Sequence, residues 1–312
     1  MSKAEYDVII VGGGPAGMTA GLYASRARLK SLLLEKMIMG GQMMTTTLVE
    51  NWPGYPGGID GPELMARFRE HCVEFGLETD TGTVEKIIDN GDTKTLIVDG
   101  EEMTCKAVIL ATGAIPRKLG IEGEEALVGK GVSYCATCDG AFFREVPIAV
   151  IGGGDTAVEE ALFLTRFASK VILVHRRDQL RATQILQDRA LANEKIEIAW
   201  NSVVDSFESD NSGLTGAVLK DTQTGETRNI EIQGMFVAVG VTPTTGFIKD
   251  LVELTEDGYV KAGEDTKTNV PGIYVAGDNR TTILRQVSTA VGDGAVAALM
   301  AERHITELDQ QK

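Results

Sequence analysis

Two cysteines separated by two residues are the side chains of this sequence best suited to redox chemistry. Cys135 and Cys138 stand in the segment Cys-Ala-Thr-Cys, and Asp139 follows directly. This spacing lowers the pKa of one thiol and allows rapid exchange between a dithiol and a disulfide. Asp139 is a candidate proton donor to the departing thiolate, although an aspartate in this place could instead cap a helix. The motif predicts a redox-active disulfide.

The same two cysteines could instead be half of a zinc site, which would require a second pair of ligands. The other cysteines, Cys72 and Cys105, are far apart in the sequence, and the chain has only three histidines. His71 stands beside Cys72, but this spacing matches no common zinc site. We therefore interpret the motif as redox-active and expect no metal.

The elements that must position this chemistry follow a pattern that occurs twice. Each copy is a short apolar strand, a glycine-rich turn, a helix and a second apolar strand. The first copy has strands at 6–11 and 31–34, with a helix to about 27; the second has strands at 147–151 and 170–174, with a helix to about 168. This order is typical of a dinucleotide-binding unit. We therefore predict an α/β fold with two Rossmann-like dinucleotide-binding domains.

The first copy contains the fingerprint Gly12-x-Gly14-x-x-Gly17 and ends its second strand at Glu35. The glycines allow the backbone to approach a pyrophosphate at the helix N-terminus, and the acid can accept hydrogen bonds from ribose hydroxyls. Both NAD and FAD fit this pattern. The glycine-rich loop around Gly40-Gly41-Gln42 and Asn51-Trp52-Pro53-Gly54 is long enough to wrap an extended cofactor, which favours FAD.

Two later turns follow strands at the carboxyl edge of the predicted sheet, where such sheets bind ligands. Asp278 in one of them could bind a ribitol hydroxyl, or could simply cap a helix or a turn. The start of the last helix could face the flavin pyrimidine carbonyl. We expect these residues to bind FAD: Gly12, Gly14, Pro15, Ala16, Gly17, Glu35, Lys36, Gly41, Gln42, Asn51, Val84, Thr112, Gly113, Asp278, Arg285, Gln286 and Val287.

The second copy ends in basic residues instead of an acid. His175-Arg176-Arg177 follows its second strand, and Arg181 stands four positions after Arg177. Guanidinium groups bind a 2′-phosphate in a bidentate manner, so this copy favours NADP; the alternative is an ordinary solvated basic face. We expect these residues to bind NADPH: Gly152, Gly154, Asp155, Thr156, His175, Arg176, Arg177 and Arg181.

The second copy lies between parts of the first domain. We expect residues 1–117 and 245–312 to form one discontinuous domain that binds FAD. We expect residues 118–244 to form the inserted domain, which binds NADPH and carries the Cys-x-x-Cys motif.

The composition narrows the class of protein. The chain has 312 residues, enough for two domains, and a formal net charge of −15, which argues against nucleic acid as a partner. No apolar stretch approaches the roughly 20 residues of a membrane span. The N-terminus enters a strand pattern with no sign of a signal peptide. We expect a cytoplasmic protein.

These motifs together resemble one family along the whole chain. The segments CATCDGAFF, GGGDTAVEEALFLTRFASKVILVHRRDQLRA, GGGPAG, VENWPG, VAGD and RQVSTAVGDG are similar to those of bacterial and archaeal low-molecular-weight thioredoxin reductases. The resemblance implies a homodimer that passes electrons from NADPH through FAD to the disulfide, and then to thioredoxin or a thioredoxin-like protein. It also implies that Cys138 is the sulfur nearest the flavin and that Asp139 is the acid.

One segment departs from the family pattern. After Gly277-Asp278 the family usually has a valine and a second aspartate, whereas this chain has Asn279-Arg280-Thr281-Thr282.

Two other functions could use some of the same sequence motifs. A ferredoxin or flavodoxin reductase would not need Cys135 and Cys138, and a redox sensor without enzymatic activity would not need the arginines of a hydride donor site.

Overall fold

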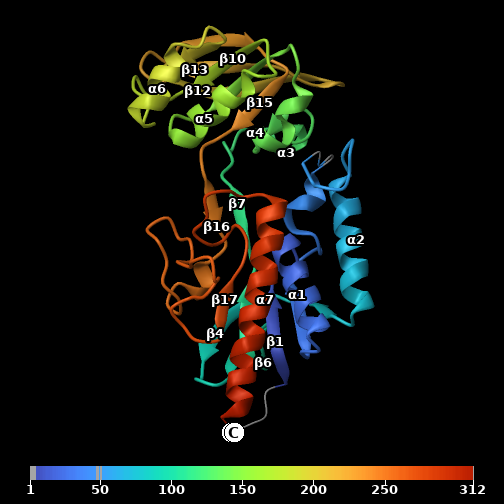
Figure 1. Cartoon of the computed structure of the whole chain (residues 1–312). Coiled ribbons are helices and arrows are strands. Elements are labelled where there is room, and N and C mark those ends of the chain that lie inside the picture. Colours follow the sequence, from blue (N-terminus) through green and yellow to red (C-terminus); the bar gives the residue numbers. More distant parts are fainter. Residues whose placement is uncertain (1–4, 47–48, 50, 312) are drawn as a thin grey trace. The chain divides into compact units, whose positions relative to one another are not determined.

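The computed structural model describes residues 5–46, 49 and 51–311. The chain divides into two compact units, one of residues 1–115 and 242–312 and the other of residues 116–241 (Figure 1). The breaks expected from the sequence, after residues 117 and 244, lie within three residues of these. The two connecting segments, β7 (Ala114–Pro116) and β16 (Val241–Pro243), pair with each other in a two-stranded sheet.

The first unit, which we call the N/C unit, is built on a seven-stranded sheet. Its strands lie in the order β3-β2-β1-β6-β5-β4, and β17 also pairs with β6. The strands are β1 (Tyr6–Val11), β2 (Ser31–Glu35), β3 (Glu78–Thr81), β4 (Val84–Asp89), β5 (Lys94–Val98), β6 (Glu101–Leu110) and β17 (Ile273–Val275). β1, β2, β3, β6 and β17 are parallel, so their carboxyl ends meet at one edge.

Helices cover one face of this sheet. The helices of the unit are α1 (Pro15–Arg26), α2 (Gly61–Glu74) and α7 (Val287–Gln310), with short 3₁₀ turns at Gly41–Thr45 and Gly246–Ile248. α1 and α7 lie side by side (Figure 1). They pack closely because Gly294 has no side chain: an added Cβ would lie 2.2 Å from the carbonyl oxygen of Ala16.

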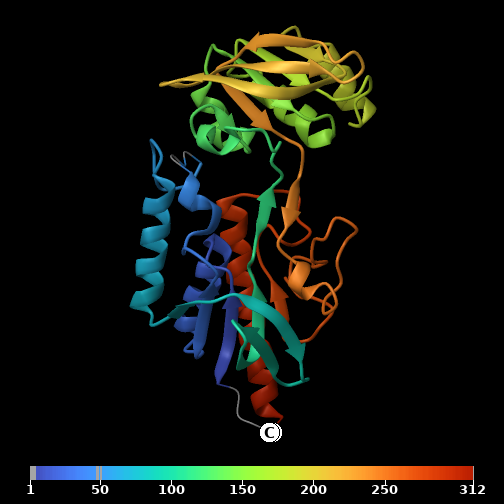
Figure 2. The same ribbon diagram turned by 180° about the vertical axis from the view of Figure 1, so that it is seen from behind.

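The opposite face of the parallel strands is covered by the antiparallel strands β4 and β5 and by loops. β4 and β5, drawn in teal in Figure 2, pack their apolar residues against those of β1, β2 and β6. Residues of the central strands are therefore buried on both faces, and Val8, Ile9 and Ile10 are completely inaccessible to solvent. This is why the strands have continuous apolar sequences instead of alternating ones.

The inserted unit repeats this design on a parallel sheet of order β11-β10-β9-β15-β8. A three-stranded antiparallel sheet of β12, β13 and β14 covers one face, and α5 and α6 cover the other. The strands are β8 (Val132–Ser133), β9 (Pro147–Ile151), β10 (Lys170–Val174), β11 (Ile196–Ala199), β12 (Ser202–Asp210), β13 (Gly213–Asp221), β14 (Thr227–Glu231) and β15 (Gly234–Val237). The helices are α3 (Glu124–Leu127), α4 (Ala136–Asp139), α5 (Asp155–Leu164) and α6 (Gln184–Leu191), with a 3₁₀ turn at Gly140–Phe142.

The α/β prediction with two Rossmann-like units is confirmed. The strands expected at 6–11, 147–151 and 170–174 have the predicted bounds. The helix expected to reach about residue 168 ends at Leu164, because the N–H groups of Arg166 and Phe167 then donate to carbonyls three residues back instead of four, which tightens the turn.

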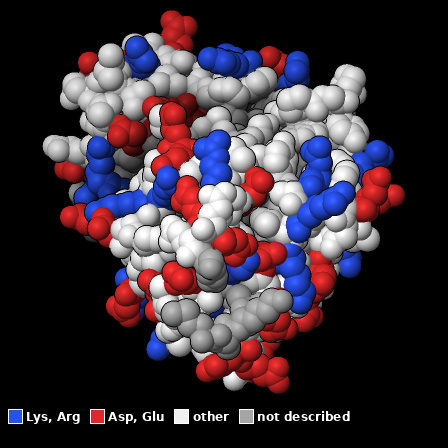
Figure 3. Space-filling model, turned by 60° about the horizontal axis from the view of Figure 1, so that its bottom comes forward, with Lys and Arg blue, Asp and Glu red and all other residues white. Residues whose placement is uncertain are grey.

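Charged side chains are distributed over the surface. On the face shown in Figure 3, acidic and basic side chains are intermixed. Within the described part of the chain, none of the helices is both long enough and apolar enough to cross a membrane.

Candidate redox and cofactor sites

Cys135 and Cys138 form a disulfide in the inserted unit, with their Cα atoms 5.3 Å apart. Cys135 is the N-cap residue of α4, and its carbonyl oxygen accepts hydrogen bonds from the N–H groups of Cys138 and Asp139. This single turn brings the two sulfurs together, and both residues are half-buried.

Cys72 and Cys105 are buried free thiols in the other unit, and burial raises their pKa values to about 11 and about 12. The described residues contain no group of three or more potential metal ligands.

Asp139 is held beside the disulfide by Ser133. The Ser133 hydroxyl donates to Asp139 Oδ2 at 2.6 Å and accepts a hydrogen bond from the N–H of Cys135 at 3.1 Å. Burial raises the pKa of Asp139, and the hydrogen bond from Ser133 opposes this effect. Asp139 ends α4 and is the N-cap residue of the 3₁₀ turn at Gly140–Phe142, but its side chain makes no capping hydrogen bond to that turn.

Two further acids contact the redox segment, and the sequence did not predict them. Glu124 Oε1 accepts a hydrogen bond from the hydroxyl of Tyr134 at 2.8 Å, directly before Cys135. The Glu160 carboxylate on α5 accepts a hydrogen bond from the N–H of Ala136, and burial raises its pKa to about 7. Glu160 stands four residues before the buried Leu164, so the helical repeat places both on the same face of the helix. This spacing is the sequence signal that could have identified Glu160 as an inward-facing acid.

The first glycine turn lies at the carboxyl edge of the N/C sheet. Gly12 has a φ of +110°, and an added Cβ would lie 2.3 Å from the carbonyl oxygen of Ala111. A Cβ on Gly17 would lie 1.8 Å from the carbonyl oxygen of Gly12. By contrast, a Cβ on Gly14 would meet no atom within 4 Å. The first and third glycines thus serve packing, and the second faces open space, as binding of a pyrophosphate at the start of α1 requires.

Glu35 is fixed against this turn. Its Oε2 accepts a hydrogen bond from the N–H of Gly13 at 2.7 Å, and its Oε1 accepts one from Met37 at 3.1 Å. The carboxylate therefore lies beside the open face of the turn, where a ribose would bind. Lys36 is exposed beside it, whereas the Val84 side chain packs in the core, so only the backbone of Val84 could contact a ligand.

Other predicted FAD residues come together at the same edge. A Cβ on Gly41 would lie 3.1 Å from the Cα of Gly14, so this loop runs against the glycine turn. Asn51 Nδ2 donates to Gln286 Oε1 at 2.9 Å, joining the loop to the start of α7. The Gln42 amide donates to the carbonyl of Ala114.

Thr112 and Gly113 form the turn after β6. The Thr112 hydroxyl donates to the carbonyl of Thr244 at 2.7 Å, and the carbonyl of Gly113 accepts a hydrogen bond from the N–H of Thr244 at 3.0 Å. Gly113 has a φ of +65°, which favours glycine at this point.

Asp278 lies where β17, α1 and α7 meet. A Cβ on its neighbour Gly277 would lie 3.0 Å from the Cβ of Ala16. Burial raises the pKa of Asp278 to about 6, Arg285 opposes this effect and Asp293 adds to it. None of the described residues donates a hydrogen bond to its carboxylate, so it remains an acceptor for a ligand hydroxyl. Arg285 stacks on Tyr259, with its guanidinium carbon 4.4 Å from the ring centroid, directly before Gln286 and Val287.

The second glycine turn has the same local design in the inserted unit. A Cβ on Gly152 would lie 2.5 Å from the carbonyl oxygen of Ala238, whereas the nearest atom to a Cβ on Gly154 would be Nη2 of Arg181 at 3.9 Å. Asp155 begins α5 and its Oδ1 accepts a hydrogen bond from the N–H of Thr183 at 2.7 Å. Thr156 is exposed in the first turn of the helix. This turn also leaves space for a pyrophosphate at its second glycine.

The basic residues after β10 divide into two places. Arg176 and Arg177 are exposed at the strand end, and neither pairs with an acid among the described residues. Arg181 instead lies at the glycine turn, where its N–H donates to the carbonyl of Gly153 at 2.7 Å. The His175 ring packs against Gly153, and burial lowers the pKa of His175, which favours a neutral imidazole at pH 7.

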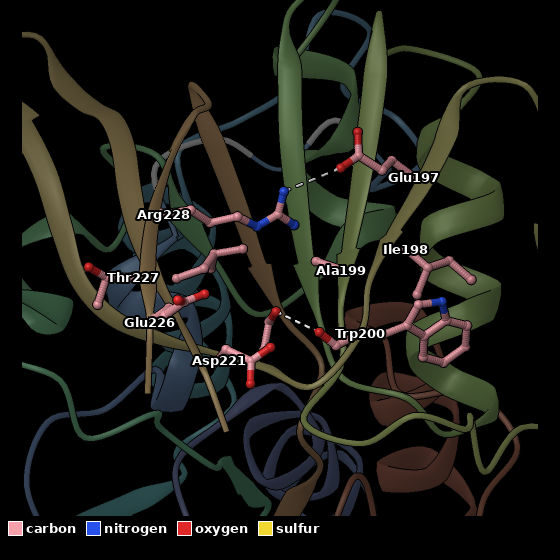
Figure 4. Close-up of a pocket in the computed structure, with 10 residues that line it drawn as sticks. Glu197, Ile198, Ala199, Trp200, Asp221, Glu226, Thr227 and Arg228 are labelled. Carbon is pink, nitrogen blue, oxygen red and sulfur yellow. Dashed lines mark hydrogen bonds and ion pairs between the residues drawn. The ribbon is translucent and has the colours of Figure 1, made fainter. Parts of the chain in front are cut away.

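A cavity of about 360 Å³ lies elsewhere in the inserted unit, between β11 and the three-stranded sheet (Figure 4). Figure 4 shows Glu197 and Arg228 facing each other across it as an ion pair, with Trp200 at its side. None of the sequence-predicted site residues line this cavity. It is therefore separate from the glycine turn and from the disulfide.

Comparisons with known proteins identify the family of the chain. The family model of pyridine nucleotide-disulphide oxidoreductases matches residues 6–294. A thioredoxin reductase of Mycolicibacterium smegmatis is 48% identical over 309 residues, covering 99% of both chains, and one of Listeria monocytogenes is 47% identical over 305 residues, covering 98% of this chain and 95% of the relative. The crystal structure of thioredoxin reductase from Streptococcus pyogenes matches with a TM-score of 0.94 and 45% identity, over 98% of this chain and all of the other. The chain therefore belongs to the pyridine nucleotide-disulphide oxidoreductase family and, within it, to the thioredoxin reductases.

Proposed function

We propose that the chain transfers electrons from NADPH, through FAD and the Cys135–Cys138 disulfide, to the disulfide of thioredoxin or a thioredoxin-like protein. The observation that carries this proposal is that one compact unit contains both the disulfide and the glycine turn at Gly152–Gly154. Arg176 and Arg177 lie in the same unit and form no ion pair with an acid among the described residues. FAD and NADPH are the cofactors of the family, so the sequence-based prediction of both cofactors is confirmed.

We assign FAD to the N/C unit and NADPH to the inserted unit. The open faces of Gly14 and Gly154 support both assignments, because each leaves room for a pyrophosphate. Glu35 supports a free ribose in the first site, and Arg176 and Arg177 support a 2′-phosphate in the second. Asp278 would accept a ribitol hydroxyl, because its carboxylate lacks a donor among the described residues.

The reaction places specific demands on the disulfide segment. The chemistry that FAD supplies when bound is two-electron exchange between a nicotinamide and a disulfide. Two electrons break the Cys135–Cys138 bond, and two protons are needed to form the dithiol. Asp139 can hold one of these protons beside the sulfurs, because burial raises its pKa. One thiolate then attacks the disulfide of the partner, and the other cysteine resolves the mixed disulfide and restores Cys135–Cys138.

We also propose a homodimer in the cytoplasm. A cytoplasmic location fits a catalytic disulfide that must cycle through its dithiol, because reducing compartments favour such cysteines over structural ones. The molar mass in solution, measured by light scattering, tests the dimer: the mass of one chain would contradict it. Cell fractionation tests the location.

The central experiment is an anaerobic titration of the purified protein with NADPH. We expect bleaching of the flavin absorbance together with two new thiols that react with a thiol reagent. The variant with both Cys135→Ser and Cys138→Ser should bleach without new thiols. Bleaching without new thiols in the unaltered protein would contradict the proposal and favour a ferredoxin or flavodoxin reductase.

A further inference from the structure

The segment that departs from the family pattern forms a buried ion pair. Arg280 donates from Nε to Asp293 Oδ2 and from Nη2 to Asp293 Oδ1, each at 2.7 Å. The side chains are only 11% and 14% exposed. Bidentate pairs of this kind fix the orientation of both groups. Arg280 thereby attaches the loop after β17 to α7.

The same two residues hold the backbone on both sides of Asp278. Asp293 Oδ2 also accepts a hydrogen bond from the N–H of Gly277 at 3.0 Å. Arg280 Nη1 donates to the carbonyl of Thr281 at 2.9 Å and to that of Gly263 at 3.3 Å. The loop is thus joined to α7 and to the segment at Gly263.

Asn279 adds a third attachment. It is completely buried, and its Nδ2 donates to the carbonyl of Leu110 at 3.2 Å and to the hydroxyl of Thr112 at 3.1 Å. These contacts join the loop to the carboxyl end of β6. Asn279 and Arg280, which replace the usual valine and its neighbour, therefore fix the backbone after Asp278, and Asp293 fixes Gly277 before it.

We propose that the Arg280–Asp293 ion pair is a positioning device for FAD, which holds Asp278 ready to accept a ribitol hydroxyl and offsets the charge of Asp293 behind it. This inference rests on the proposed role of Asp278 in FAD binding. It explains how a loop without the usual second aspartate can still be ordered before the cofactor binds. Such preorganisation increases affinity, because less ordering remains to be done on binding.

The electrostatics of the loop give the proposal a distinctive consequence. The charged groups that act on Asp278 are Arg285, which lowers its pKa, and Asp293, which raises it. Removal of the guanidinium of Arg280 leaves the charge of Asp293 without compensation. Asp278 should then hold its proton to a higher pH and become a weaker acceptor at pH 7. A purely structural ion pair would not change this pH dependence.

The test compares FAD affinity in full-length holoenzymes between about pH 5 and 8, a range that brackets the Asp278 transition. Equilibrium ultrafiltration of dilute protein separates bound from released FAD, which is quantified by fluorescence. Arg280→Met removes the charge but keeps the length of the side chain. Arg69→Met is the matched control, because Arg69 is an exposed arginine of α2 in the same unit.

We expect Arg280→Met to weaken FAD binding at pH 7 by about tenfold or more, the factor that one charge-assisted hydrogen bond is worth. The pH at which affinity falls to half should move upward. Adding Asp293→Asn should move it back, because the carboxylate that acts on Asp278 is then neutral. Arg280→Lys keeps the positive charge, so the pH at which its FAD affinity falls to half should equal that of the unaltered protein. This variant also remains available for the test if Arg280→Met does not fold.

An unchanged affinity in Arg280→Met, or a loss that is equal at every pH and not corrected by Asp293→Asn, would overturn the proposal. Asp278→Asn separates this result from failure of the proposed function. If Asp278→Asn weakens FAD binding and removes its pH dependence while Arg280→Met has no effect, only the ion pair is excluded. If Asp278→Asn has no effect, the assignment of Asp278 to FAD is itself wrong.

Discussion

Glu160 should make the stability of the inserted unit depend on pH, and Glu160→Gln should remove that dependence. The carboxylate accepts a hydrogen bond from the N–H of Ala136, and burial raises its pKa from an ordinary 4.5 to about 7. Glutamine retains an oxygen that can accept the same hydrogen bond but cannot ionise. The substitution therefore removes the titration and keeps the contact with the redox segment.

The magnitude follows from the two pKa values. Their difference corresponds to about 3 kcal/mol, because one unit of pKa is about 1.4 kcal/mol. Since the folded state has the higher pKa, Glu160 does not destabilise the fold below pH 4.5. The cost develops as the pH rises and is complete above about 7. Glu160→Gln should therefore match the unaltered protein at low pH and exceed its free energy of unfolding by about 1–3 kcal/mol at pH 8, after allowing for burial of the amide.

Urea unfolding at several pH values measures this difference. The chain has two tryptophans, Trp52 and Trp200, and only Trp200 lies in the inserted unit. A Trp52→Phe background thus reports on unfolding of the unit that contains Glu160. Glu159→Gln is the matched control, because Glu159 is the preceding residue of the same helix and is exposed.

The reasoning fails if Glu160→Gln changes the free energy of unfolding by the same amount at every pH. It also fails if Glu159→Gln reproduces the pH-dependent gain, since an exposed carboxylate carries no comparable desolvation cost.

Three further predictions concern the reaction itself. The double variant Arg176→Ala, Arg177→Ala should raise the KM for NADPH by roughly ten- to a hundredfold per phosphate contact. The KM for NADH should stay nearly unchanged. Anaerobic flavin reduction measures both constants, and equal losses for the two coenzymes would show that the arginines are structural. We expect Cys138 to be the sulfur nearest the flavin, as the family resemblance implies. Cys135→Ser should then leave a thiolate at Cys138 and produce a long-wavelength charge-transfer absorbance that Cys138→Ser lacks; the opposite result would reverse this assignment. Asp139→Asn should slow reduction of thioredoxin most strongly at low pH, where Asp139 of the unaltered protein holds its proton, and a loss independent of pH would argue against a proton role.

The sequence predicted the elements that depend on local patterns. The strands at 6–11, 147–151 and 170–174 are mainly apolar runs, the first two followed by glycine turns and the third by basic residues, so neighbouring residues alone determine them. The contact between Asn51 and Gln286 joins residues 235 positions apart, and no local pattern could indicate it, although both residues were predicted to bind FAD. The same reason applies to Arg280 and Asp293, whose pairing depends on how α7 packs beside β17.

Acids near the disulfide were the most difficult part to predict. Asp139 was identified because it adjoins a cysteine, but Glu124 and Glu160 reach the redox segment from α3 and α5. A buried carboxylate cannot be distinguished in the sequence from the many exposed ones, because 45 residues are acidic. Only the helical face shared with Leu164 marked Glu160 as inward-facing.

The two glycine-turn units, to which we assign FAD and NADPH, share one backbone design but differ at the end of the second strand. In both, the middle glycine of the turn contacts the residue at the carboxyl end of the second strand: Gly13 donates to the Glu35 carboxylate, and Gly153 packs against the His175 ring. A carboxylate at this point repels a 2′-phosphate, whereas a neutral imidazole does not. His175 thus leaves the space in which Arg176 and Arg177 can act. The difference in nucleotide preference therefore requires both the added arginines and the replacement of the acid, so arginines introduced beside Glu35 alone should not create an NADP site.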